Sequence, residues 1–251
     1  MSLSTRNVQT TYSASDTTGA QTRTISYTVG AGTELLVVIA RLSAGEVSAA
    51  DVSAVRWADS GGGSDENLTS KVQRASPGGL GARVEIWYLA NPTARAGLVE
   101  CDYTVTTSGI RATSWTILEV IGGVDTAAPT GASANSNGTA AAAPLSLTST
   151  VAGSLILSSV AHVDIVNDPY TPGAGITAEL AEGNTAEAST GHSYWAGEGL
   201  TTTAGAYAVG ATGSGASKNF AAVAFEVLPV VGAPSNAFPF RRPNFTHMLV
   251  R

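Results

Sequence analysis

The sequence predicts an all-β protein, a two-sheet β-sandwich built from two similar halves, and three observations support this prediction. Short segments rich in Val, Ile, Thr and aromatic residues recur along the whole chain. Gly, Asn, Asp and Pro separate these segments at intervals suited to turns. No stretch keeps an apolar period of 3.6 residues between helix caps, so we expect helix only in short turns.

The first half of the chain contains six predicted strands. The segment TRTISYTVG (22–30) partly alternates polar and apolar residues, which is typical of a strand with one buried face. The next segment contains LLVVIA (35–40), the longest apolar run, which has strand length and is far short of the roughly 18 residues of a membrane span. The six segments are 22–30, 34–42, 52–58, 82–90, 97–107 and 111–122.

The second half repeats this order. TVGAGTELLVVIARLS is echoed by STVAGSLILSSVAHVD, and SWTILEVIGGVD is echoed by AAVAFEVLPVVG. A third comparison aligns Trp87 with Trp195. The six predicted strands of this half are 143–151, 154–164, 175–183, 191–197, 203–211 and 218–231.

The repeat predicts one domain with short appendages. We expect the two halves, residues 21–126 and 143–232, to form a single sandwich between them, because half a chain of short Gly-rich strands has a small core. Residues 127–142 are rich in Ala, Gly and Asn and are interpreted as a linker. Residues 1–20 are interpreted as an N-terminal extension.

Residues 233–251 are interpreted as an extended C-terminal docking arm. The segment FPFRRPNFTHMLVR (238–251) holds three of the five Phe and three of the thirteen cationic side chains. Its two prolines exclude a regular helix through its first half. Aromatic, Met and Arg side chains are enriched at interface cores, which favours docking on a partner; the alternative is that the arm folds back and seals its own sandwich. The predicted docking residues are Phe238, Phe240, Arg241, Arg242, Phe245 and Met248.

Composition excludes several classes of function. Charged residues make up 13%, against about 25% in an average soluble domain, and the net charge is −6. A nucleic-acid-binding protein is expected to show a basic face, and no segment before residue 238 supplies one. The first residues lack the apolar core of a signal peptide. Cys101 is the single cysteine and lies in an apolar strand pattern, so we expect it to be buried and unreactive.

The polar residues predict no catalytic site and no cofactor. Three His are present, but no Ser lies in a G-x-S-x-G elbow, so a Ser–His–Asp hydrolase is not indicated. Carboxylates such as Glu85 and Glu119 show no spacing that marks a glycosidase pair. We therefore expect a protein without enzyme activity.

Two acidic loops are weak candidates for calcium. DSGGGSDEN (59–67) and DIVNDP (164–169) collect carboxylate and amide oxygens, but neither has the spacing of an EF-hand. Solvated acidic loops are the alternative. The candidate ligands are Asp59, Asp65, Asp164 and Asp168.

Aromatic side chains beside loops are candidates for a glycan site. Trp57 and Tyr170 border Gly- or Pro-rich loops, where an exposed ring could stack on a sugar. Packing in the core or at its rim is the favoured interpretation of both rings, because large aromatic side chains are usually mostly buried.

The order of motifs resembles a known kind of module. An apolar strand after a Gly turn is followed by V-E-I-W-Y (84–88), an N-P-T turn (91–93) and a strand starting A-T-S-W (112–115) that leads into G-V-D (123–125). This order resembles the jelly-roll or lectin-like β-sandwich modules of bacterial surface proteins and phage structural proteins, over about residues 20–230. The resemblance implies a jelly-roll-like sandwich that binds or decorates.

Together these features predict a non-enzymatic structural protein of a tailed phage or phage-like particle, such as a capsid decoration, head fibre or tail accessory. It would lie in the virion, bind other virion proteins and copies of itself through the arm, and form an oligomer. The alternative is a secreted, extracellular or cell-surface carbohydrate-binding or adhesion module of a bacterium. A glycan hydrolase on the same sandwich is a third, weaker possibility.

Overall fold

The computed structural model describes residues 2–13, 19–44, 50–61, 63–77, 81–105, 110–163, 170–184, 192–213 and 217–231. Within these ranges every regular element is a β-strand and every strand pairing is antiparallel, which confirms the all-β prediction. The described part of the chain contains no helix with the length and apolar character that crossing a membrane requires.

The first half of the chain forms two sheets. The five-stranded sheet has the order β1-β9-β3-β7-β6 and the four-stranded sheet the order β2-β8-β4-β5. Between Asn67 and Thr69 the chain crosses from the four-stranded sheet to the five-stranded sheet, and the side chain of Leu68 at this crossing is buried. The strands are β1 (Ser4–Ser13), β2 (Gly19–Thr28), β3 (Leu35–Ala44), β4 (Ala50–Ala58), β5 (Glu66–Asn67), β6 (Thr69–Ala75), β7 (Gly81–Ala90), β8 (Ala96–Val105) and β9 (Ile110–Ile121).

The second half forms a five-stranded sheet, β10-β19-β13-β16-β15, and two small ones, β11-β18-β14 and β12-β17. Its strands are β10 (Thr130–Ala140), β11 (Ala142–Ala143), β12 (Ser146–Ser149), β13 (Leu155–Val163), β14 (Thr171–Pro172), β15 (Ala178–Asn184), β16 (His192–Leu200), β17 (Gly205–Ala208), β18 (Ala211–Thr212) and β19 (Lys218–Val227).

The two halves share one strand order, as the sequence repeat predicts. The five-stranded sheets correspond position by position, with β1 matching β10 at one edge and β6 matching β15 at the other. Irregularities match closely too, since the register shifts of the β1–β9 and β10–β19 pairings lie within one residue of equivalent positions. The turn before the inner strand carries a glycine at positive φ in both halves, 78° at Gly32 and 81° at Gly153. We call the two halves the first and the second repeat.

Sheet register corrects one predicted equivalence. Leu35 and Leu155 open β3 and β13 and pair with Ala90 and Leu200, so Trp195 is equivalent to Glu85 and not to Trp87. The equivalent of Trp87 is Gly197, and the ring of Trp195 lies against that glycine. Because Gly197 has no side chain, the indole ring of Trp195 can lie over its backbone.

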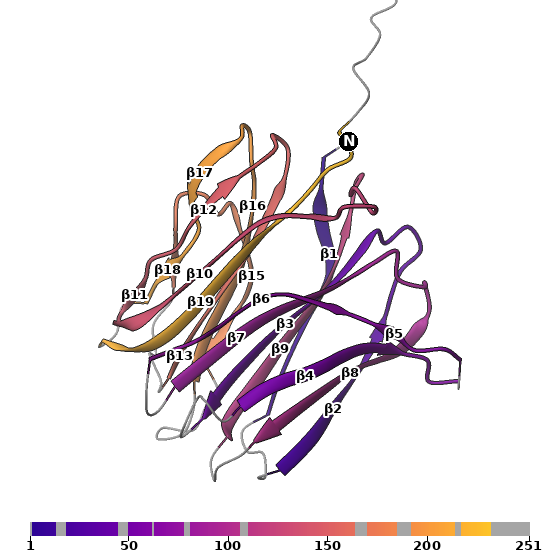
Figure 1. Cartoon of the computed structure of the whole chain (residues 1–251), viewed down its shortest axis with the longest axis horizontal. Coiled ribbons are helices and arrows are strands. Elements are labelled where there is room, and N and C mark those ends of the chain that lie inside the picture. The colour runs from indigo at the N-terminus through magenta and orange to yellow at the C-terminus, as the bar shows by residue number, and fades with distance from the viewer. Residues whose placement is uncertain are drawn as a thin grey trace, which may run out of the picture.

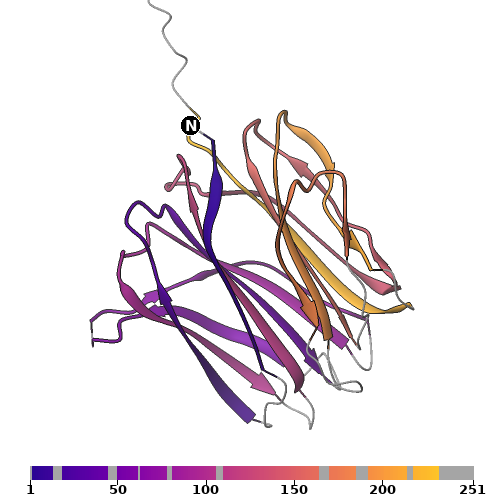
Figure 2. The same ribbon diagram turned by 180° about the vertical axis from the view of Figure 1, so that it is seen from behind.

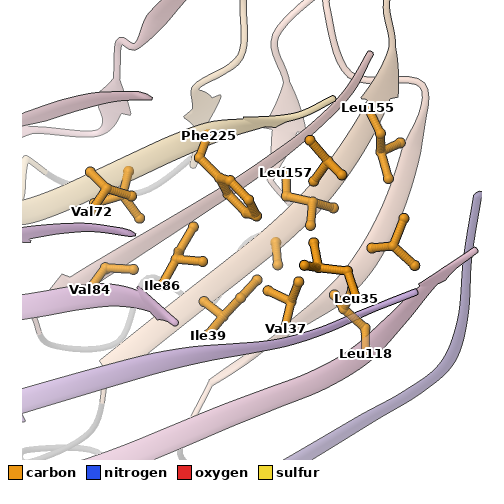
Figure 3. Packing of buried hydrophobic residues seen from close by; sticks show 14 of the residues in the cluster. Leu35, Val37, Ile39, Val72, Val84, Ile86, Leu118, Leu155, Leu157 and Phe225 are labelled. Carbon is orange, nitrogen blue, oxygen red and sulfur yellow. The ribbon is translucent and has the colours of Figure 1, made fainter. Parts of the chain in front are cut away.

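The sheets stack in four layers and enclose three cores (Figure 1). One core lies inside each repeat, between its five-stranded sheet and its smaller sheets. The third lies between the two five-stranded sheets, where Leu35, Val37 and Ile39 of β3 face Leu157 of β13 and Phe225 of β19 (Figure 3). The prediction of a single two-sheet sandwich is therefore wrong in the number of layers: each repeat is a sandwich, and the two pack through their inner sheets.

The predicted appendages also need correction. The proposed N-terminal extension, residues 1–20, contains β1, and the proposed linker, residues 127–142, contains β10. Both strands are edges of the five-stranded sheets, and both are polar or small in sequence. An edge strand contributes few side chains to a core, so it lacks the apolar pattern that identifies inner strands.

Candidate functional site

Trp57, a predicted glycan-stacking residue, is fully buried in the core of the first repeat. Its indole N–H donates to the carbonyl oxygen of Thr93 at 3.0 Å. Tyr27 meets the ring edge-on, with ring centroids 6.4 Å apart, and the Arg95 guanidinium lies 5.5 Å from the ring centroid. The favoured interpretation of core packing is therefore correct for Trp57, and its ring lacks the exposure that the candidate glycan site requires.

Tyr170, the second predicted glycan residue, is also buried, with 6% of its surface exposed. It packs in the core of the second repeat, and its backbone N–H donates to the Glu182 carboxylate. Core packing is correct for Tyr170 for the same physical reason as for Trp57, since a large aromatic ring beside a loop fills the end of the sandwich. Neither residue presents a face to a sugar.

A chain of hydrogen bonds runs through Tyr170 and joins it to His162 and Ser193. The Tyr170 hydroxyl lies 2.8 Å from His162 Nδ1 and 2.8 Å from the Ser193 hydroxyl. His162 Nε2 lies 3.2 Å from the carbonyl oxygen of Ala140. A carbonyl only accepts, so Nε2 carries the proton and Nδ1 accepts from Tyr170, whose oxygen then accepts from Ser193. Each group therefore donates a hydrogen bond to the next, in the order Ser193, Tyr170, His162 and the carbonyl oxygen of Ala140.

This arrangement places a serine, a tyrosine and a histidine in contact, but it is enclosed. His162 has no exposed surface and Ser193 has 1%. Burial lowers the pKa of His162 to about 4, against the ordinary 6.5, so the ring is neutral at pH 7. Burial likewise raises the pKa of Tyr170 above its ordinary value. We read this cluster as an internal polar support of the second repeat. Sequence reasoning did not connect its three members, because they come from separate strands and a loop.

A second buried polar group lies between the repeats. Arg41 of β3 points at the second repeat, where its Nε donates to the Ser159 hydroxyl at 2.7 Å and its guanidinium lies 5.1 Å from the Tyr194 ring centroid. Its Nη1 donates to the Thr116 hydroxyl at 3.0 Å. The side chain is fully buried, and burial lowers the pKa of Arg41 to about 10, so it stays charged at neutral pH. This side chain joins the two inner sheets.

Of the four predicted calcium ligands, Asp59 and Asp65 lie in the described residues. Asp59 is partly exposed, and its carboxylate accepts the backbone N–H groups of Gly61 at 2.8 Å and Gly63 at 3.0 Å. The Gly61 bond, with the one from Gly63, lowers the pKa of Asp59. Asp65 is exposed, whereas Asp164 and Asp168 lie outside the described residues. Among the described residues, no three His, Cys, Asp or Glu side chains form a group able to hold a metal ion.

The predicted docking residues Phe238, Phe240, Arg241, Arg242, Phe245 and Met248 lie outside the described residues. Cys101, by contrast, is fully buried in the core of the first repeat, and burial raises its thiol pKa above the ordinary value. The prediction of a buried cysteine is therefore confirmed, and a buried protonated thiol is a poor nucleophile.

The surface of the described residues carries two hollows. The larger, about 870 Å³, runs between the edge strands β1 and β2 of the first repeat and is lined by both strands, by the start of β8 and by Ser60. The smaller, about 570 Å³, lies over the small sheet β11-β18-β14 and is lined mainly by Ala, Gly and Pro. Neither contains the predicted glycan or calcium residues.

Comparison with known proteins adds no relative. No family model matches the chain, and no curated protein or solved structure is significantly similar to it.

Proposed function

We propose that this protein is a non-enzymatic structural protein of a tailed phage or phage-like particle, a capsid decoration, head fibre or tail accessory anchored through its C-terminal arm. The body, which is the part of the chain before the arm (residues 1–232), serves as a rigid projecting module. The arm, with Phe238, Phe240, Arg241, Arg242, Phe245 and Met248, binds the particle or neighbouring subunits.

One observation carries the proposal: the polar groups suited to chemistry are used to build the body. Glu119 and Glu226 are saturated with hydrogen bonds, His162 is enclosed with Tyr170, and Arg41 joins the two sheets. A body stiffened in this way suits a particle component that must stay folded outside the cell.

The strand order supports the module type. With β5 and β6 counted as one strand, the first repeat has eight strands in two antiparallel sheets. Jelly rolls are eight-stranded double sheets of this general kind, found in viral capsid and lectin domains. We assign both repeats to this type.

The rival, a secreted carbohydrate-binding or adhesion module, depended on exposed aromatic rings at Trp57 and Tyr170. Both rings are buried, so we prefer the particle component.

The experiment is to fractionate a lysate of the producing cells and to image the particles by electron microscopy with an antibody raised against residues 1–231. We expect the protein in the particle fraction at a fixed ratio to the other particle proteins. Recovery only as secreted, particle-free protein would contradict the proposal.

A further inference from the structure

The groove between β1 and β2 is built from the edges of two sheets. β1 is the outer strand of the five-stranded sheet and β2 the outer strand of the four-stranded sheet, so in the described residues neither has a strand partner on its outer side. Figure 2 brings β1, the darkest strand, to the front of the molecule. Unpaired strand edges attract an additional strand unless they are covered.

Two side chains bridge β1 and β2 at this groove, and each already holds one backbone carbonyl of the facing strand. The Gln9 side chain donates to the carbonyl oxygen of Ser26 at 3.3 Å, and the Tyr27 hydroxyl donates to the carbonyl oxygen of Asn7 at 2.7 Å. Val8 also lines the groove and is 38% exposed. Away from these two bridged carbonyls, the groove combines the outer edges of two sheets with an uncovered apolar side chain.

The last described residues lie near the N-terminal end of β1, the strand that forms one side of the groove. Pro229 pairs with Val124, and the backbone N–H of Val230 donates to the carbonyl oxygen of Gly123 at 2.7 Å. The neighbouring Gly122 lies against Ser2, two residues before β1 begins. Val230 is 58% exposed and Val231 is 72% exposed, so the chain leaves the body with its apolar side chains uncovered.

Charge also distinguishes the arm from the body. Residues 233–251 contain three Arg and no Asp or Glu, a formal charge of +3. The remaining ten Lys and Arg against nineteen Asp and Glu give the body a charge of −9. Two bodies therefore repel one another, and the arm is the segment that offsets this repulsion.

The spacing of the prolines suits an added edge strand. In an extended strand, alternate backbone N–H groups point to the same side. Pro239 and Pro243 are four residues apart, so both missing N–H groups fall on one side and the other side keeps its donors. Such a segment pairs with one strand only, as an edge strand does.

We propose that the β1–β2 groove of one copy of this chain binds the C-terminal arm of a second copy, which adds along the groove as an edge strand. The arm of the first copy binds the groove of the second copy in the same way. Phe238 is seven residues beyond Val231, a reach of about 23 Å when extended, which suits exchange between two copies whose arm-exit corners adjoin. This inference rests on the proposed docking function and names the receptor for the arm. Reciprocal exchange closes as a dimer.

The direct test is a cross-link between two differently labelled chains. One chain carries Ser60→Cys in the groove, and the other carries Thr246→Cys in the arm; Cys101 is buried and does not compete. After mixing under mild oxidation, we expect a disulfide-linked pair of twice the 25.3 kDa chain mass. Leu200→Cys, which lies outside the groove, replaces Ser60→Cys as the control and is expected to give no pair.

A non-covalent test uses two matched residues. Val8 and Leu200 are both 38% exposed, but only Val8 lines the groove. We expect Val8→Arg to weaken dimerisation roughly tenfold or more in sedimentation, because it repels the cationic arm, and Leu200→Arg to leave it unchanged.

Two results would overturn the proposal. A full-length chain that is monomeric and forms no mixed cross-link has no arm exchange. A chain bearing both cysteines that closes only on itself places the arm in its own groove. The anchoring function is tested separately, by deleting residues 238–251 and measuring incorporation into particles. If incorporation still requires these residues, the anchoring function is supported even when arm exchange is not.

Discussion

Glu119 and Glu226 hold the same place in the two repeats. Each is fully buried near the end of the last strand of its repeat, β9 or β19, and each accepts a backbone N–H from the turn before the inner strand. The donors are Gly30 at 3.1 Å and Val151 at 3.2 Å. The carboxylates tie the final strand to that turn, so each repeat is closed by one buried acid.

We predict that Glu226→Gln destabilises the fold. Glu226 also accepts from Thr150, through its backbone N–H and its hydroxyl, both at 2.8 Å. Burial by itself raises the pKa of Glu226, but the bonds from Ala132, Ser154 and Thr150 outweigh burial and lower it. The amide NH₂ of a glutamine would face N–H and O–H groups that are themselves donors, so hydrogen bonds would be lost. We expect a loss of about 2–3 kcal/mol in the free energy of unfolding, measured by urea denaturation.

The exposed Asp65 provides the control for this experiment. Asp65→Asn should change the free energy of unfolding by less than about 0.5 kcal/mol. Equal effects of the two substitutions would show that the buried acid does not close the repeat.

The inner strands of this fold are readable from the sequence, and the number of layers was readable too. In LLVVIA, Leu36 and Val38 enter the core of the first repeat, while Leu35 and Val37 enter the core between the repeats. A run that is apolar on both faces is typical of a strand covered on both sides. That signal indicates an inner sheet between two others, which a two-sheet sandwich does not contain.

The polar supports were not readable in the same way. Arg41 lies in an apolar strand and meets Ser159, which is 118 residues away in the chain. His162 meets Tyr170 through a loop and Ser193 through strand pairing. Such contacts depend on the packing of the two repeats and on strand register, and a single sequence without relatives records neither.

We predict that His162 makes the fold sensitive to mild acid. The unfolded chain binds a proton at His162 near pH 6.5, whereas the folded protein resists protonation until about pH 4. Stability is therefore fully present above pH 6.5, and it falls by about 3 kcal/mol as the pH decreases to about 4. Urea denaturation at a series of pH values measures this loss.

The matched variant is His162→Leu, because Leu42 is the equivalent residue in the first repeat. The variant keeps the bond between Tyr170 and Ser193. Its free energy of unfolding should depend much less on pH between 6.5 and 4. An unchanged pH dependence would assign the effect to other groups.

We predict that the charge of Arg41 is not required for stability. Ser159 also donates to the carbonyl oxygen of Trp195 at 2.8 Å, and Thr116 shares a hydrogen bond with Thr10 at 3.0 Å, so both hydroxyls keep a partner. Replacing a buried charge with an apolar side chain of similar length is often neutral or stabilising by about 1–4 kcal/mol. Arg41→Met should therefore unfold at the same or a higher urea concentration.

The companion variant is Arg41→Ala, which leaves a cavity between the repeats and should lower the free energy of unfolding by about 2 kcal/mol or more. If the Met variant loses as much as the Ala variant, the guanidinium itself holds the two sheets together.

We predict that Cys101 reacts with a thiol reagent only when the protein opens. The thiol is fully buried and its pKa is raised by burial, so the reactive thiolate is scarce in the native state. The measurement is the rate of modification with and without urea. Rapid modification of the native protein would show that the core of the first repeat opens locally.

The last prediction concerns the arm. Deleting residues 238–251 should leave a soluble protein that unfolds cooperatively, because the deletion removes no residue of the three described cores and keeps the contact of Val230 with Gly123. The same deletion should abolish incorporation into the particle.

Three Phe and Met248 contribute roughly 1.5–3 kcal/mol each when fully buried, whereas ordering fourteen residues costs on the order of 1–2 kcal/mol apiece. Burial alone falls short, so the docked arm must also gain backbone hydrogen bonds and contacts from Arg241 and Arg242 to carboxylates. A truncated chain that melts without cooperativity would show that the arm seals its own body, and normal incorporation would show that it is not the anchor.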